Sequence, residues 1–194
     1  MIQTLKYAAL MGAILVLLAA AAILAGQTNR TQFMAVTAKL PELHVRFADP
    51  IWGGETLPDG MWCDRYEGSR AMSPPLFVSG IPVGANAIIV EFNDENVFFL
   101  DDGGGHGAIG YWINNAPEVM LDAVPPGIYD IGPVAFVEHD PLIPFGLMGG
   151  GYLPPCSGGR GNLYTADVLA VFKSKSDSGR NRLLAKGSIT LGRY

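Results

Sequence analysis

The chain has 194 residues, of which 49% are apolar and only 16% are charged, and its formal net charge is −5. Its 25 glycines and 14 prolines favour a β-rich fold with long loops over a helical one. The acidic balance, with no stretch that mixes Lys or Arg with aromatic residues, argues against a nucleic-acid partner.

Residues 1–26 are expected to form a transmembrane anchor or signal segment. The run from Ala8 to Ala25 carries no charge, and as a helix it would rise about 27 Å, close to the ~30 Å hydrocarbon core of a bilayer. A secretory signal usually has a shorter apolar stretch and a small-x-small cleavage site, whereas Ile23 or Leu24 stands here where a small residue is needed. The sequence therefore favours an uncleaved anchor, followed by a tether over residues 27–44.

The rest of the chain, residues 45–194, is predicted to form one β domain. Alternation and apolar runs predict strands over 45–47, 87–92, 96–100, 108–113, 128–131, 134–137, 165–172 and 183–191. A turn is expected at 93–95. The consecutive prolines Pro74 and Pro75 argue against a helix or a central strand at their position.

The loop from Gly149 to Tyr164 is rich in glycine and proline and leads directly into the predicted strand 165–172. Such a loop on a rigid scaffold is a common place for a binding site. The alternative is that it only connects two strands.

Further blocks stand in a characteristic order along the chain. They are Cys63-Asp64 with Ser73-Pro74-Pro75-Leu76 and Gly80-Ile81-Pro82, the strand from Ile88 to Phe92 with its acidic turn, Tyr111 through Pro117, and Tyr152 through Cys156 to Tyr164. In this order they resemble the phosphatidylethanolamine-binding protein family in its bacterial form. Residues 184–194 resemble the closing strand of that family, so the resemblance covers about residues 45–194.

The resemblance implies a mainly β fold, an antiparallel two-sheet sandwich, here preceded by one transmembrane helix. It also implies a pocket at one edge that binds phosphate or phospholipid head groups, where two carboxylates, two histidines, a tyrosine and loop amides converge. Imidazolium, phenol and amide groups all donate hydrogen bonds, which suits an anion.

Carried onto this chain, the pocket is eroded. The Asp-Pro-Asp turn of the family falls within 92–95 and loses its proline, and the His-Trp pair falls on Gly110-Tyr111 or Tyr111-Trp112 and loses its histidine. The His-Arg-Tyr triplet becomes Asn162-Leu163-Tyr164. The ligand candidates that the resemblance leaves are Asp94, Tyr111, Pro155, Asn162 and Tyr164, with the amides of residues 158–161.

The three histidines form no metal signature, and no metal or cofactor is expected. His106 could replace a lost histidine of the pocket, but between glycines it is more simply a solvated loop residue. Asp94 is likewise expected to be a solvated turn carboxylate. His139 has strand neighbours that point to opposite faces, which does not suit a metal site.

Cys63 and Cys156 are the only cysteines, and the resemblance places their loops at the same end of the fold. A disulfide would suit a domain outside the cytoplasm. Two buried thiols are the alternative.

Catalysis has little support, because Ser73 has no evident base and no Cys-His pair is spaced for nucleophilic work. We expect a membrane-anchored, non-catalytic interaction protein, an accessory or structural subunit of a larger membrane complex such as a respiratory or photosynthetic assembly. It would cross the bacterial inner membrane once, with its domain in the periplasm, and its partners would be the bilayer and other subunits. The alternative is an extracytoplasmic binding protein for a small anion or phospholipid head group.

Overall fold

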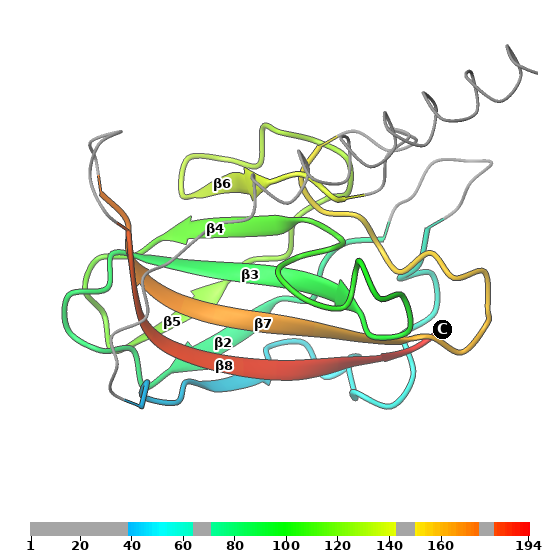
Figure 1. The fold of residues 1–194 in the computed structure, drawn as a ribbon, viewed down its shortest axis with the longest axis horizontal. Coiled ribbons are helices and arrows are strands. Elements are labelled where there is room, and N and C mark those ends of the chain that lie inside the picture. The colour runs from blue at the N-terminus through cyan, green and yellow to red at the C-terminus, as the bar shows by residue number, and fades with distance from the viewer. Residues whose placement is uncertain (1–38, 64–70, 143–149, 175–180) are drawn as a thin grey trace, which may run out of the picture. The chain divides into compact units, whose positions relative to one another are not determined.

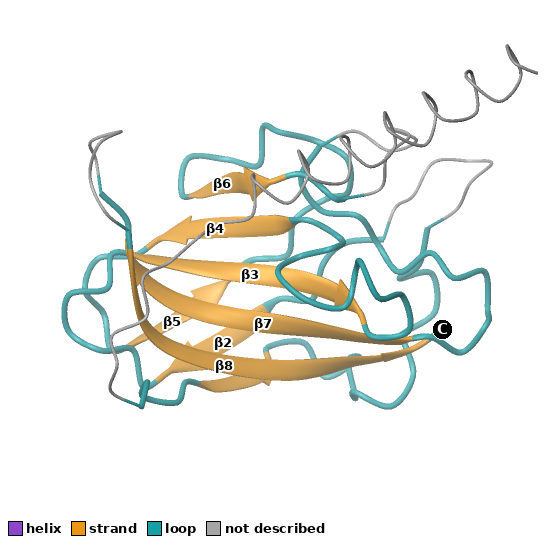
Figure 2. Ribbon diagram, viewed as in Figure 1, coloured by secondary structure: helices purple, strands orange, loops and turns teal. Residues whose placement is uncertain are grey.

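The computed structural model describes residues 39–63, 71–142, 150–174 and 181–194, and all regular elements among them are β-strands joined by loops (Figure 2). The strands are β1 (His44–Phe47), β2 (Leu76–Ser79), β3 (Ala87–Asp94), β4 (Ala108–Trp112), β5 (Glu118–Leu121), β6 (Ala135–His139), β7 (Leu163–Phe172) and β8 (Arg182–Arg193).

The strands form two antiparallel sheets. One has five strands in the order β6-β4-β3-β7-β8, and the other has three strands in the order β1-β2-β5. Figure 1 shows β2 and β5 behind β3 and β7, so the two sheets lie as two layers. The mainly β, antiparallel two-sheet fold expected from the sequence is confirmed for this part of the chain.

Strand β3 lies at the centre of the larger sheet and is buried along its whole length. Ile88, Val90 and Phe92 belong to the main core between the sheets, while Ala87 and Ile89 pack with residues of β4 and β7 in a second cluster. Strands buried on both faces favour continuous apolar runs, and residues 87–90 form such a run, which is why this strand is the clearest in the sequence.

Some strand predictions are wrong. Residues 96–100 form a turn rather than a strand, because the apolar pair Phe98 and Phe99 points to solvent instead of alternating into a core. No strand forms at 128–131, and β3 continues through the turn predicted at 93–95 as far as Asp94.

Strands β2 and β5 were not predicted. β2 begins directly after Pro75 and is the middle strand of the smaller sheet. Pro75 accepts the main-chain N–H of Ala48 at 2.9 Å, so the prolines precede the strand, where their missing donors do not interrupt a ladder.

The folded part begins before residue 45. Leu43, which the sequence assigns to the tether, is 3% exposed in the main core, and its N–H donates to the Lys186 oxygen at 3.0 Å. The predicted anchor between Ala8 and Ala25 lies outside the described residues. Among the residues that are described, there is no helix with the length and apolarity needed to cross a bilayer.

Candidate functional site

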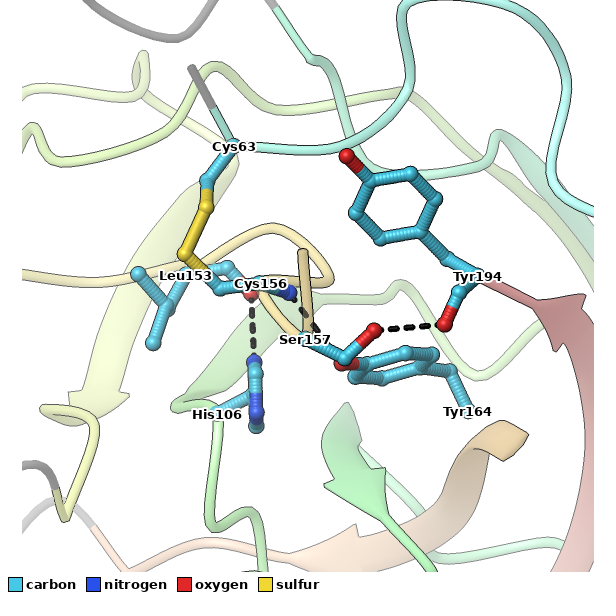
Figure 3. Close-up of a disulfide and its surroundings, with 7 residues drawn as sticks. All are labelled: Cys63, His106, Leu153, Cys156, Ser157, Tyr164 and Tyr194. Carbon is cyan, nitrogen blue, oxygen red and sulfur yellow. Dashed lines mark hydrogen bonds between the residues drawn. A yellow bond between two sulfur atoms is a disulfide. The ribbon is translucent and has the colours of Figure 1, made fainter. Parts of the chain in front are cut away.

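The candidate site lies where three strands of the larger sheet meet at one end. Asp94 ends β3 and is paired with Tyr164 of β7, and Tyr164 is in turn paired with Gly192 near the end of β8. The pairing of β7 with β8 is irregular between Tyr164 and Thr165, and such bulges often redirect side chains beside a site. Loops carrying His106 and Ser157 complete the surroundings (Figure 3).

Asp94 is a buried carboxylate with several hydrogen-bond donors around it. It is 3% exposed, and the Asn162 side-chain amide donates to its two oxygens at 2.8 and 3.0 Å. The main-chain N–H of Asn96 donates to Oδ1 at 3.0 Å. The expectation of a solvated turn carboxylate is therefore wrong, because β3 continues as far as Asp94 and Asn162 in the loop before β7 covers the carboxylate.

His106 is also buried, with 3% of its surface exposed. Its Nδ1 lies 3.2 Å from the main-chain oxygen of Leu153, and its ring meets the Tyr164 ring edge-on at 5.4 Å. Burial lowers the pKa of His106, although the Leu153 oxygen and Asp94 oppose this shift. A carbonyl oxygen can only accept, so the neutral ring carries its proton on Nδ1.

The main chain fixes the position of His106. Its N–H donates to the Phe92 oxygen at 2.8 Å, and its own oxygen accepts the Leu153 N–H at 2.9 Å. The next residue, Gly107, has a φ of 95°, and a Cβ there would lie 2.0 Å from the Gly151 oxygen. Only glycine allows the two loops to approach this closely, and the approach brings His106 against Leu153.

Tyr164 joins the cluster to the long loop. Its hydroxyl accepts the Cys156 N–H at 3.1 Å, and burial raises its pKa to about 12, so it stays a neutral phenol. Ser157 next to Cys156 donates its hydroxyl hydrogen to the main-chain oxygen of Tyr194, and the Gly161 N–H donates to the same oxygen at 2.7 Å. The loop is thus tied to β7 and to the end of β8.

A disulfide joins Cys63 to Cys156 in the structure, with their Cα atoms 5.1 Å apart. The N–H of Cys63 also donates to the Pro155 oxygen at 2.9 Å. The loop before residue 64 is therefore attached directly beside Tyr164 (Figure 3).

The structure brings together Asp94, Asn162 and Tyr164, but it separates Tyr111 from them. Tyr111 pairs with Ile88, six residues along β3 from Asp94, which places the two roughly 20 Å apart at about 3.3 Å per residue. The Tyr111 hydroxyl donates to the Asp122 oxygen at 2.9 Å, and burial raises its pKa. Tyr111 is therefore a core residue, which corrects its prediction as a member of the ligand set.

Pro155 lies close to the cluster but contributes no hydrogen-bond donor to it. The residue is buried and has no N–H to donate, and its oxygen is taken by Cys63.

The sequence indicates a solvated loop residue at His106 and assigns no role to Ser157. The flanking glycines of His106 indicated a solvated loop, yet they permit the tight return between β3 and β4. One signal in the sequence could have indicated its burial: His106 lies just before the predicted strand that corresponds to β4.

The segment from Gly158 to Gly161 is open. Residues 158–161 are exposed, and a Cβ added at Gly158, Gly159 or Gly161 would have no neighbour within 4 Å. Arg160 is the cation in this loop.

In the described part of the chain, no three His, Cys, Asp or Glu side chains gather in a group that could hold a metal ion. The cluster offers instead a neutral imidazole, a phenol, and a carboxylate with amide donors. Its hydrogen bonds run mainly between its own members and the adjoining loops.

No protein-family model and no curated protein matches the chain. The chain is similar to the crystal structure of E. coli YbcL, presented as a new member of the mammalian PEBP family, with 20% identity, a TM-score of 0.49, and coverage of 79% of this chain and 98% of that one. It is also similar to a phosphatidylethanolamine-binding protein homolog from Chlamydia trachomatis, with 18% identity, a TM-score of 0.46, and coverage of 79% and 97%.

Proposed function

We propose that the chain is a membrane-anchored, non-catalytic interaction protein that serves as an accessory or structural subunit of a larger membrane assembly, such as a respiratory or photosynthetic complex. Its β domain would act as a docking surface. The observation that carries this proposal is that the polar side chains of the cluster form hydrogen bonds within the protein: Asn162 donates to Asp94, and the Tyr164 hydroxyl accepts the Cys156 N–H.

An anion would find this cluster unfavourable. Asn162, the side-chain amide that could donate to an anion, already donates to both oxygens of Asp94. His106 is held neutral by burial, so it brings no positive charge, and the carboxylate of Asp94 would repel a phosphate. Binding would require breaking buried hydrogen bonds to a charged group, which costs about 1.5–3 kcal/mol each.

The apolar run from Ala8 to Ala25 supports the membrane part of the proposal, because its length suits a single span of the bacterial inner membrane. The disulfide between Cys63 and Cys156 supports a periplasmic domain, because disulfides persist in oxidising compartments.

The proposal is tested by purifying the full chain from its native membranes in mild detergent. We expect it to migrate as part of a complex with defined membrane proteins in fixed stoichiometry. A free monomer without its first 26 residues would contradict the proposal, because it would indicate a secreted, independent protein.

A second candidate is an extracytoplasmic protein that binds a small anion or phospholipid head group. It is favoured by the exposed residues of the open loop at 158–161 and by the cation of Arg160. This candidate expects phosphate or phosphoethanolamine to bind with an affinity that Arg160→Ala weakens.

A further inference from the structure

The turn between β3 and the loop before β4 presents an exposed aromatic side chain. We call residues 95–102 the β3 tip. Phe98 is 86% exposed, which makes it the most exposed aromatic residue of the described segments, and Phe99 packs against it edge-on with ring centroids 5.2 Å apart. An aromatic side chain that remains in water gives up the burial energy of a large apolar surface.

The β3 tip is held rigidly by hydrogen bonds. The N–H of Val97 donates to the Asp94 oxygen at 3.1 Å, the N–H of Leu100 donates to the Val97 oxygen at 2.7 Å, and the N–H of Asp94 donates to the Leu100 oxygen at 2.9 Å. Leu100 itself is buried, with 5% of its surface exposed. Phe98 is therefore presented on a closed turn rather than on a loose loop.

The tip is also fastened to β7. The N–H of Glu95 donates to the Leu163 oxygen at 2.9 Å, the N–H of Leu163 donates to Asn96 Oδ1 at 2.8 Å, and the Thr165 hydroxyl donates to Glu95 Oε1. A rigid anchor loses little conformational entropy when it binds a partner.

The charge around Phe98 indicates the chemistry of the partner. Glu95, Asp101 and Asp102 are exposed acids of the tip, and residues 87–107 contain no Lys or Arg. An anionic membrane surface would repel this acidic rim, whereas a protein surface with Lys or Arg would attract it.

We propose that the β3 tip docks into an apolar pocket, bordered by Lys and Arg, on a partner protein, with Phe98 as the anchor and Glu95 and Asp101 as the rim. This deepens the proposed function and rests on it, because it assigns the contact through which the subunit would join its assembly. Aromatic anchors in such pockets typically dominate the binding energy of an interface, while rim charges set orientation and partner choice.

The test uses the full chain in its native membranes and a photo-crosslinking side chain. Phe98→p-benzoylphenylalanine is compared with Val83→p-benzoylphenylalanine. Val83 is 99% exposed and lies in the turn before β3, at the opposite end of that strand. We expect one protein adduct from position 98, about tenfold above the yield from position 83, with Lys or Arg and apolar residues in the crosslinked peptide.

The acidic rim supplies the second arm of the test. In an Asp101→Lys background the adduct from position 98 should fall about fivefold, while the melting temperature should stay unchanged because the Asp101 side chain is exposed and Glu95, which accepts the Thr165 hydroxyl, is left in place. A lipid adduct, an adduct with a second copy of this chain, equal yields at 98 and 83, or an adduct that charge reversal does not weaken would each overturn the proposal. If the chain still co-purifies with membrane subunits in that case, the proposed function stands and the docking contact lies elsewhere.

Discussion

Two neighbouring regions at the end of β3 place their side chains in opposite ways. In the cluster of Asp94, His106 and Tyr164, the polar groups are buried and hydrogen-bonded to neighbouring residues of the protein. In the β3 tip, which begins at residue 95, the apolar Phe98 is exposed together with the acids Glu95 and Asp101. A small-molecule site usually has the reverse arrangement, with an apolar wall and a few accessible polar groups. The difference supports the proposal that recognition uses the outer surface, while the cluster ties the adjoining loops to the sheet.

On the cluster side of this comparison, removing the disulfide should cause the largest loss of stability. A Cys63→Ser/Cys156→Ser variant should lower the free energy of unfolding by roughly 4–5 kcal/mol, because the bond closes a loop of about 93 residues in the unfolded chain. Urea unfolding of the full chain in detergent measures this, and wild-type protein in reductant provides a second measurement. An unchanged midpoint under reducing conditions would show that the two loops are held without the bond.

The next largest loss of stability should come from removing the Asn162 side-chain amide, which donates to Asp94. Asn162→Ala should destabilise the protein by about 1.5–3 kcal/mol, because a buried carboxylate loses two hydrogen bonds from the side-chain amide. Asn114→Ala is the matched control, since Asn114 is exposed and its change should stay within about 0.5 kcal/mol. Equal effects of the two variants would mean that the cluster adds no stability.

The pH dependence of stability should report His106. Its pKa is lowered in the folded protein, so as pH falls below about 6.5 the unfolded chain takes up the proton first. Stability that is fully present above about pH 6.5 is then lost as pH falls toward the folded pKa, at up to about 1.4 kcal/mol per pH unit.

His106→Gln should reduce this slope in urea unfolding measured between about pH 5 and about pH 8. His44→Gln is the control, because His44 is exposed on β1 and should leave the slope as it is. If His106→Gln keeps the full acid sensitivity, other groups cause it.

The smallest effect is expected on the tip side. Phe98→Ser should change the free energy of unfolding by less than about 0.5 kcal/mol, because the side chain is 86% exposed. The core residue Phe92 sets the contrast, since Phe92→Ala should cost about 3–5 kcal/mol. A large loss from Phe98→Ser in the isolated protein would show that the ring is packed against the chain itself and is not available for docking.

The sequence predicted all five strands of the larger sheet, and most clearly β3 and β7, because each contains a short apolar run typical of a buried strand. It did not predict β2 and β5, whose four residues each are too short to show a period. For the cluster, the resemblance indicated Asp94, Asn162 and Tyr164, but their mutual hydrogen bonds depend on the pairing of β3 with β7. The burial of His106 depends on the contact between Gly107 and Gly151. These two glycines lie far apart in the sequence, so no local pattern reveals their contact.

The most direct test of the account is a calorimetric titration of inorganic phosphate into the full chain in detergent, with phosphoethanolamine as a second titrant. Because the Asn162 amide and the His106 Nδ1–H already donate within the protein, we predict no saturable heat up to about 10 mM of either titrant, a concentration that would detect millimolar binding. A saturable heat that Tyr164→Phe and Asn162→Ala both abolish would contradict the account and identify the cluster as an anion site.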